Sequence, residues 1–173
     1  MSLLRVVHYP EKVLLEVGKP VAKDEFNEDL KRLVDDMFET MYDQKGVGLA
    51  APQVDISKRL FVMDCSGGED ESQKIALINP EIIHVEGEQY GDEGCLSFPG
   101  IYTKVKRELR AIVRYQDVNG ETQELDGEDL TARCALHETD HCDGIVFLDR
   151  MSALKRELSK RKIRKLKEKG EWD

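Results

Sequence analysis

The sequence lacks any long hydrophobic run. No apolar stretch approaches the ~18 residues that a membrane-spanning helix needs, so we expect no membrane contact. Residues 3–7 alternate loosely, which predicts a short strand, and the N-terminus has none of the extended apolar character of a signal peptide. The phosphate-binding loop pattern is also missing, which excludes the commonest nucleotide-binding signature.

Cysteine is scarce as well, and its spacing is irregular. The four cysteines, at positions 65, 95, 134 and 142, show none of the paired spacing of a disulfide framework. A reducing compartment is therefore expected, and we predict a cytoplasmic protein. A chain of 173 residues without a repeat or a linker predicts one domain, large enough to bury a core without disulfides.

Charge is distributed unevenly along the chain. Residues 150–169 contain ten Lys or Arg against two Glu, a net charge of +8, which leaves −17 on the remainder. This asymmetry predicts a basic C-terminal segment that meets an anionic partner. The alternative is a solvated helix that simply ends the domain.

Histidine occurs only four times, yet two of the four lie in a His-Glu-Thr-Asp-His run at residues 137–141. In a helix, residues four apart share one face, so His137 and His141 can grip one transition-metal ion. Glu138 would then stand near a water held by that ion. Two histidines on a solvated helix face are the alternative interpretation.

A catalytic metal site usually takes a third ligand from the protein. The metzincin pattern fails because Phe147 stands where its third histidine should be. A thermolysin-like downstream Glu is disfavoured, since only 32 residues follow His141 and they are strongly cationic. The best candidate is Cys95, in the Gly-Asp-Glu-Gly-Cys-Leu-Ser segment of residues 91–97. A lone cysteine beside glycine is also typical of a buried, inert thiol.

Further elements follow from periodicity. Residues 27–44 predict a helix with Asn27 as N-cap and Gly46 just beyond its end. Residues 46–53 read Gly-Val-Gly-Leu-Ala-Ala-Pro-Gln. The small glycine and alanine side chains allow the backbone to approach another group closely, and the segment ends in Gln53, whose amide can donate and accept hydrogen bonds. A tight helix-to-strand turn with an exposed Gln would explain it equally well.

The remaining segments predict strands and two more helices. Strands are expected at residues 60–65, 75–85 with a turn inside, 109–115 and 121–125, the last two joined by Asn119-Gly120. The helix of the histidine pair should run to about Cys142 and stop near Gly144. A last helix should begin after Ser152 and dock through Met151, Leu154 and Leu158.

Three segments of the sequence can now be compared with known families: residues 46–53, 93–97 and 137–141. In this order and at these separations they resemble the three motifs of the peptide deformylases, and the likeness extends over nearly the whole chain. One departure is Leu136, because the family usually has Gln before its first metal histidine, which puts a supporting hydrogen bond in question.

The resemblance implies an α+β fold, with antiparallel sheets wrapped around a central metal-binding helix and a C-terminal helix. Residues 1–150 would form the catalytic deformylase domain, and residues 151–173 a basic helix and tail of the same domain.

The implied activity is metal-dependent removal of the N-formyl group from the initiator methionine of new polypeptides, with release of formate. The resemblance makes Cys95, His137 and His141 the ligands of one divalent ion, natively Fe(II), with Zn, Ni or Co able to replace it. A water held by the metal attacks the formyl carbon, and Glu138 serves as general base and then acid. The Gln53 amide and the Leu96 N–H face the developing oxyanion.

The resemblance also assigns the substrate site and a partner. The Gly48 backbone would pair with the extended formylmethionyl peptide, while Val47, Leu130, Cys134 and the stem of Arg133 line the methionine pocket. The basic helix, through Lys160, Arg161, Arg164 and Lys165, would contact the anionic ribosome. No DNA partner is expected.

Two other functions compete with this one. A zinc peptidase of another His-Glu-x-x-His class would share residues 137–141 but leaves the first two motifs unexplained. A non-catalytic, metal-stabilised ribosome-binding module would explain the charge, but a closed structural site has no need of Glu138 or Gln53.

Overall fold

The computed structural model describes residues 2–173. These residues form three α-helices and seven strands, joined by short 3-10 turns. The helices are α1 (Glu28–Asp43), α2 (Asp129–Cys142) and α3 (Ala153–Glu168), and the strands are β1 (Gly48–Ala50), β2 (Leu60–Met63), β3 (Ile75–Glu86), β4 (Gln89–Gly94), β5 (Tyr102–Arg107), β6 (Arg110–Gln116) and β7 (Thr122–Glu128).

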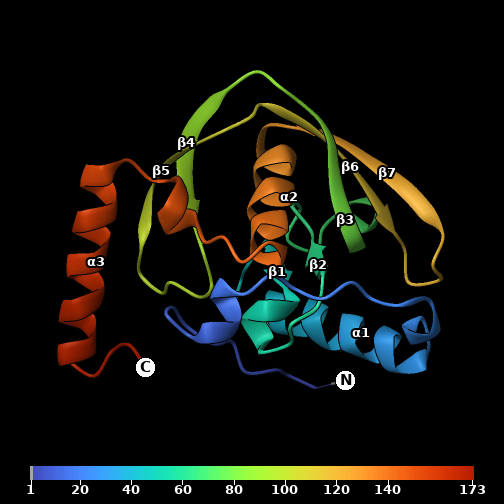
Figure 1. The fold of residues 1–173 in the computed structure, drawn as a ribbon, viewed down its shortest axis with the longest axis horizontal. Helices are drawn as coiled ribbons and strands as arrows, with labels where there is room; N and C mark the ends of the chain where they lie inside the picture. Colours follow the sequence, from blue (N-terminus) through green and yellow to red (C-terminus); the bar gives the residue numbers. More distant parts are fainter. Residues whose placement is uncertain (1) are drawn as a thin grey trace.

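The strands form two antiparallel sheets around α2. One sheet has the order β1-β2-β3-β6-β7, and the other is the β4–β5 hairpin. Figure 1 shows α2 between the two sheets, with α1 below the first sheet and α3 outermost beside the hairpin. Helix α2 is buried along nearly its whole length, from Ala132 to Cys142. The α+β fold with a central helix is thus confirmed.

Helix α1 begins as the sequence predicts but ends differently. The Asn27 side chain accepts a hydrogen bond from the Leu30 N–H at 3.1 Å, which caps the first turn. At the other end Lys45, not Gly46, takes the left-handed conformation, with φ of 57°. A Cβ at Gly46 would lie 2.8 Å from the end of the Leu96 side chain, so a larger residue would force that side chain to move. The backbone that follows α1 therefore lies close to the segment that follows β4.

The five-stranded sheet follows the predicted strands closely. Strand β3 carries register shifts near Asn79, which has a φ of 53°, so the expected interruption is a bulge inside one strand. The β6–β7 hairpin turns at Gly120, as Asn-Gly predicts. Residues 3–7 form no strand, although the Val7 N–H donates to the Gln53 carbonyl at 2.8 Å. The hairpin β4–β5 was not predicted.

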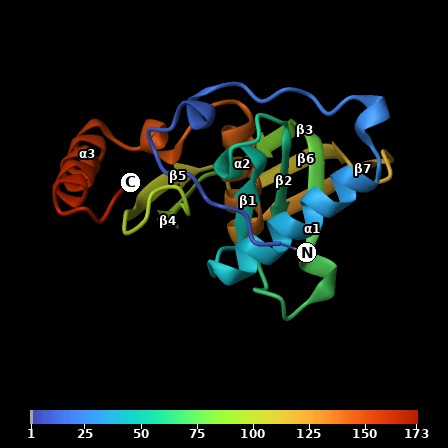
Figure 2. The same ribbon diagram turned by 90° about the horizontal axis from the view of Figure 1, so that it is seen from below.

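Helix α3 starts after Ser152, whose side chain caps it, but it packs through other residues than expected. Met151 is buried, whereas Leu154 and Leu158 are 71% and 52% exposed. Ile163 packs instead, together with Trp172 from the tail that folds back after the helix. In Figure 2 this tail returns from the end of α3 toward the body of the molecule. The periodicity of the helix alone gave no information about this returning tail.

Candidate metal centre

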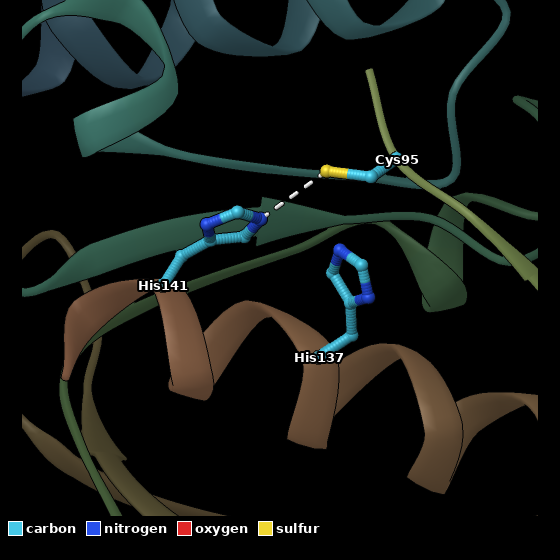
Figure 3. Close-up of side chains that lie close together, drawn as sticks. All are labelled: Cys95, His137 and His141. Atoms are coloured by element: carbon cyan, nitrogen blue, oxygen red, sulfur yellow. Dashed lines mark hydrogen bonds between the residues drawn. The ribbon is translucent and has the colours of Figure 1, made fainter. Parts of the chain in front are cut away.

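Three potential metal ligands converge where the end of β4 meets α2. His137 and His141 project from one face of α2, with ring centroids 5.0 Å apart, and Cys95 follows β4 (Figure 3). One donor atom from each residue lies within 4.8 Å of the others, and Cys95 Sγ is 3.4 Å from His141 Nε2. A thiolate and two imidazoles form a donor set that suits a divalent transition metal. Cys95 is half-buried and both histidines are buried, so the residues present fit such an ion.

Glu93 orients the first of the two histidines. Its carboxylate accepts a hydrogen bond from His137 Nδ1 at 2.6 Å, which leaves Nε2 as the free nitrogen. Burial alone would raise the pKa of Glu93, but hydrogen bonds from His137 and Arg107 hold that pKa well below its usual range. The carboxylate is therefore charged and fixes the ring. Leu136, an apolar side chain, can give His137 no hydrogen bond of this kind.

A buried charge network extends from Glu93. Arg107 donates to Glu93 at 2.7 Å and to Asp140 at 2.7 Å, and Arg150 also binds Asp140. Arg107 is almost fully buried. Its charge and those of Glu93 and Asp140 are therefore stabilised by one another and not by water. The sequence did not predict these roles. The position of Glu93 two residues before Cys95 offered only a weak signal, because its partner Arg107 lies on another strand.

Glu138 lies beside the metal-ligand cluster, against the backbone of β1. Burial is the main cause that raises the pKa of Glu138 to about 7. Its Oε1 has no hydrogen-bond partner within residues 2–173. A Cβ at Gly48 would lie 2.6 Å from the Glu138 Oε2 atom, so only glycine permits this approach. The carboxylate therefore lies in a confined site with its Oε1 atom free.

Gln53 and Leu96 lie around the same thiol. The Gln53 side chain is buried, accepts a hydrogen bond from the Ala50 N–H at 2.9 Å, and directs its NH₂ group to Ser97 Oγ at 3.3 Å and Cys95 Sγ at 3.6 Å. It is thus not the exposed Gln of a simple turn. Leu96 is half-buried and lines the adjacent cavity.

A cavity of about 270 Å³ opens next to the cluster. All five residues that the resemblance assigns to the substrate line it: Val47, Gly48, Leu130, Arg133 and Cys134. The Arg133 Nη1 atom donates to Glu93 at 2.8 Å and to the Val105 carbonyl at 3.0 Å, which fixes the guanidinium beside the cavity. Lys45, Asp92 and Tyr102 also line it, and the sequence did not predict them.

Comparison with known proteins gives a consistent answer. The sequence profile described as polypeptide deformylase matches residues 3–157. The chain belongs to this family. It is 55% identical to the peptide deformylase of Acidobacterium capsulatum, over 99% of this chain and 100% of that protein, and 48% identical to that of Chromobacterium violaceum, over 95% and 96%. The crystal structure of a peptide deformylase from Legionella pneumophila superposes with a TM-score of 0.89, at 43% identity and 96% coverage of both chains.

A deformylase is a metal-dependent hydrolase that removes the N-formyl group from newly made polypeptides, and this is the activity of the chain. The Cys95, His137 and His141 cluster is a possible site for its metal. Among residues 2–173, no helix combines the length and the apolar character needed to cross a membrane.

Proposed function

We propose that Cys95, His137 and His141 hold one divalent metal ion and that Glu138 transfers the proton in deformylation. The observation that carries this proposal is the convergence of the three donor atoms beside a buried carboxylate with a free oxygen. When bound, the metal lowers the pKa of a water and polarises the formyl oxygen. Glu138 takes the proton of that water and delivers it to the leaving amine.

The protein also orients the substrate. Strand β1 pairs only with β2, so its other edge at Gly48 is open to the cavity and can bind an extended peptide. The methionine side chain enters between Val47, Leu130 and Cys134, along the stem of Arg133. The Gln53 NH₂ group and the Leu96 N–H donate to the oxygen on which negative charge develops. Losing one such donor typically reduces the rate about 100–1000-fold.

The direct test compares two reactions of the purified enzyme. Formate release from formylmethionyl peptides is expected, whereas cleavage of an internal bond in an unformylated peptide is not. Cys95→Ser should lose affinity for the metal, because a hydroxyl is a poor ligand. A cobalt-loaded Cys95→Ser protein that keeps its sulfur-to-metal absorption would contradict the assignment of Cys95.

We further propose Fe(II) as the native metal. A thiolate and two imidazoles accommodate iron as well as zinc, nickel or cobalt, and thiolate-bound iron is open to oxidation. Metal analysis of protein purified without air should find iron, and activity should decay on exposure to air. Activity that is equal and lasting in air would favour zinc or nickel.

We also propose that α3 docks the enzyme to the ribosome in the cytoplasm, close to the emerging substrate. Arg161, Arg164 and Lys165 are exposed, and none of them forms a salt bridge within residues 2–173. Lys160 beside them is half-buried. Binding to the anionic RNA surface through such groups releases counterions and falls steeply with salt.

Charge reversal is the appropriate test, because deleting the helix would also remove the buried Ile163 and Trp172. Changing Arg161, Arg164 and Lys165 to Glu should weaken co-sedimentation with ribosomes at low salt and leave hydrolysis of a short peptide unchanged. Reversal of the exposed Lys12, Lys19 and Lys23 is the matched control. Equal co-sedimentation of both variants with the wild type would show that α3 is only a solvated helix.

A further inference from the structure

Two cysteines from different parts of the chain meet next to the substrate cavity. Cys65 directly follows Asp64, whose N–H donates to the Val47 carbonyl at 2.8 Å. Cys134, on α2, donates its thiol to the same carbonyl at 3.6 Å. Cys65 packs against the core cluster that contains Cys134. The fold therefore brings two cysteines that are 69 positions apart in the sequence into one cluster around the Val47 carbonyl.

The two thiols have different environments. Cys65 is half-buried, and hydrogen bonds with Cys134 and Thr131 lower its pKa, although burial and the Asp64 carboxylate oppose this. Cys134 is buried, and the hydrogen bond with Cys65 together with burial raises its pKa well above the usual value. A half-buried thiol with a lowered pKa, next to a thiol with a raised pKa, is an arrangement that favours oxidation of the first thiol.

Cys134 also forms part of the cavity wall. Its sulfur would lie 2.8 Å from a Cβ at Gly48, the residue that also faces Glu138. A change at this sulfur therefore alters the space beside β1 directly.

We propose that Cys65 is a redox-sensing thiol, which a hydroperoxide oxidises and which Cys134 then converts into an intramolecular disulfide at the wall of the substrate cavity. The Cys65 thiolate attacks the peroxide, the O–O bond breaks, and an alcohol or water leaves, so that Cys65 becomes a sulfenic acid. The Cys134 sulfur then attacks the Cys65 sulfur. The S–O bond breaks and water departs with the Cys134 proton, so two electrons pass from the two thiols to the peroxide.

The consequence for catalysis rests on the proposed function, in which this cavity holds methionine. An S–S bond of about 2.05 Å draws the Cys134 sulfur toward Cys65 and away from the Val47 carbonyl. The pocket wall then changes shape, while Glu138 and the three metal ligands are untouched. The expected effect is about a tenfold loss in kcat/KM, expressed mainly as a higher KM.

Peptide mapping tests the disulfide independently of activity. Zinc-loaded enzyme, which has no redox-active metal, is treated with hydrogen peroxide and digested without reduction. The expected product joins the Cys65 and Cys134 peptides with the loss of two hydrogens. Cys142 serves as the internal control, because burial raises its pKa to about 12 and it should stay unmodified.

Two variants separate the steps. In Cys134→Ser the Cys65 sulfenic acid has no partner, so dimedone should label it. In Cys65→Ser neither a disulfide nor a label at Cys134 should form. A Cys65 that stays reduced while Cys95 is oxidised, or that links only to another molecule, would overturn the proposal.

Kinetics then test the effect on the pocket. The KM of the oxidised wild type for a formylmethionyl peptide should rise and return to its original value with dithiothreitol. Cys65→Ser should keep its starting KM before and after peroxide. A disulfide that leaves KM unchanged would refute the link to the substrate cavity. If no form of the enzyme releases formate, the proposed function fails, and peptide mapping still decides whether the disulfide forms.

Discussion

Replacing Glu138 with Gln exchanges one oxygen of a buried side chain for an NH₂ group. The amide cannot accept a proton from water, so turnover should fall by roughly 100–10,000-fold. The metal should remain, because Glu138 is not one of the three converging donors. Metal content and formate release measured on one preparation check both expectations. A variant that loses its metal but regains full activity when refilled would reverse the assignment of roles.

At Gly48 the backbone of β1 lies close to the Glu138 carboxylate. In Gly48→Ala the new methyl group would meet Glu138 Oε2 at 2.6 Å and Cys134 Sγ at 2.8 Å. One of the two side chains must move, so we expect a loss of at least about tenfold in kcat/KM, since small displacements of catalytic groups are costly. Gly91→Ala is the matched control, because its Cβ would meet only the end of the Arg133 side chain, at 3.4 Å. Equal losses in both variants would mean that the closeness of Glu138 is unimportant.

At the scale of residues, the part of the site that could be predicted consists of residues close together in the sequence. His137 and His141 lie on one helix, so their spacing alone places them together. Cys95 required a contact between distant segments. Exclusion of other third ligands made it the best candidate, and the family resemblance then assigned it. Glu93 could not be predicted from its own neighbourhood, because its orientation depends on Arg107 across the hairpin.

At the scale of elements, the β4–β5 hairpin is fixed to α2 by the buried charges around Arg107. Arg107→Ala would leave Glu93 and Asp140 buried without their shared partner, and breaking such a pair lowers stability by about 3–5 kcal/mol. Because Glu93 holds His137, metal affinity should also fall by roughly 10–100-fold. Thermal unfolding and a chelator competition measure the two effects.

The control for this prediction is an exposed arginine pair in the other sheet. Arg114 on β6 binds Glu124 on β7 at 2.9 Å, with both side chains about half exposed. Exposed pairs contribute about 0–1 kcal/mol, so Arg114→Ala should barely change the unfolding temperature or the metal affinity. Similar losses in the two variants would show that burial of the Arg107 network is unimportant.

The elements themselves were predicted unevenly. Helices α1 and α2 followed from apolar spacing and capping residues, and the β6–β7 turn from Asn-Gly. The packing of α3 did not follow, because Ile163 is buried by a tail that returns after the helix has ended. Within residues 3–7, Val6 and Val7 are buried without a strand partner, and the sequence pattern does not distinguish that case from a sheet.

At the scale of the whole molecule, Trp172 joins the two ends of the chain. Its Nε1–H donates to the Tyr9 carbonyl at 2.7 Å, and its ring packs against Phe98 with centroids 6.1 Å apart. Phe98 in turn contacts Phe147, and its N–H donates to the Cys95 carbonyl. The C-terminal tail thereby supports the segment that carries the proposed thiolate ligand.

Trp172→Ala should therefore destabilise the molecule as a whole. Truncating a buried tryptophan typically lowers the free energy of unfolding by about 3–5 kcal/mol, and the Tyr9 carbonyl would also lose its donor. Leu154→Ala is the control on the same C-terminal region, since Leu154 is 71% exposed and should change stability by less than about 0.5 kcal/mol. Denaturant unfolding of the metal-loaded proteins measures both changes. If Trp172→Ala unfolds at the same denaturant concentration as the wild type, the tail does not contribute to stability. In that case Ile163 and its neighbours alone hold α3 on the body of the protein.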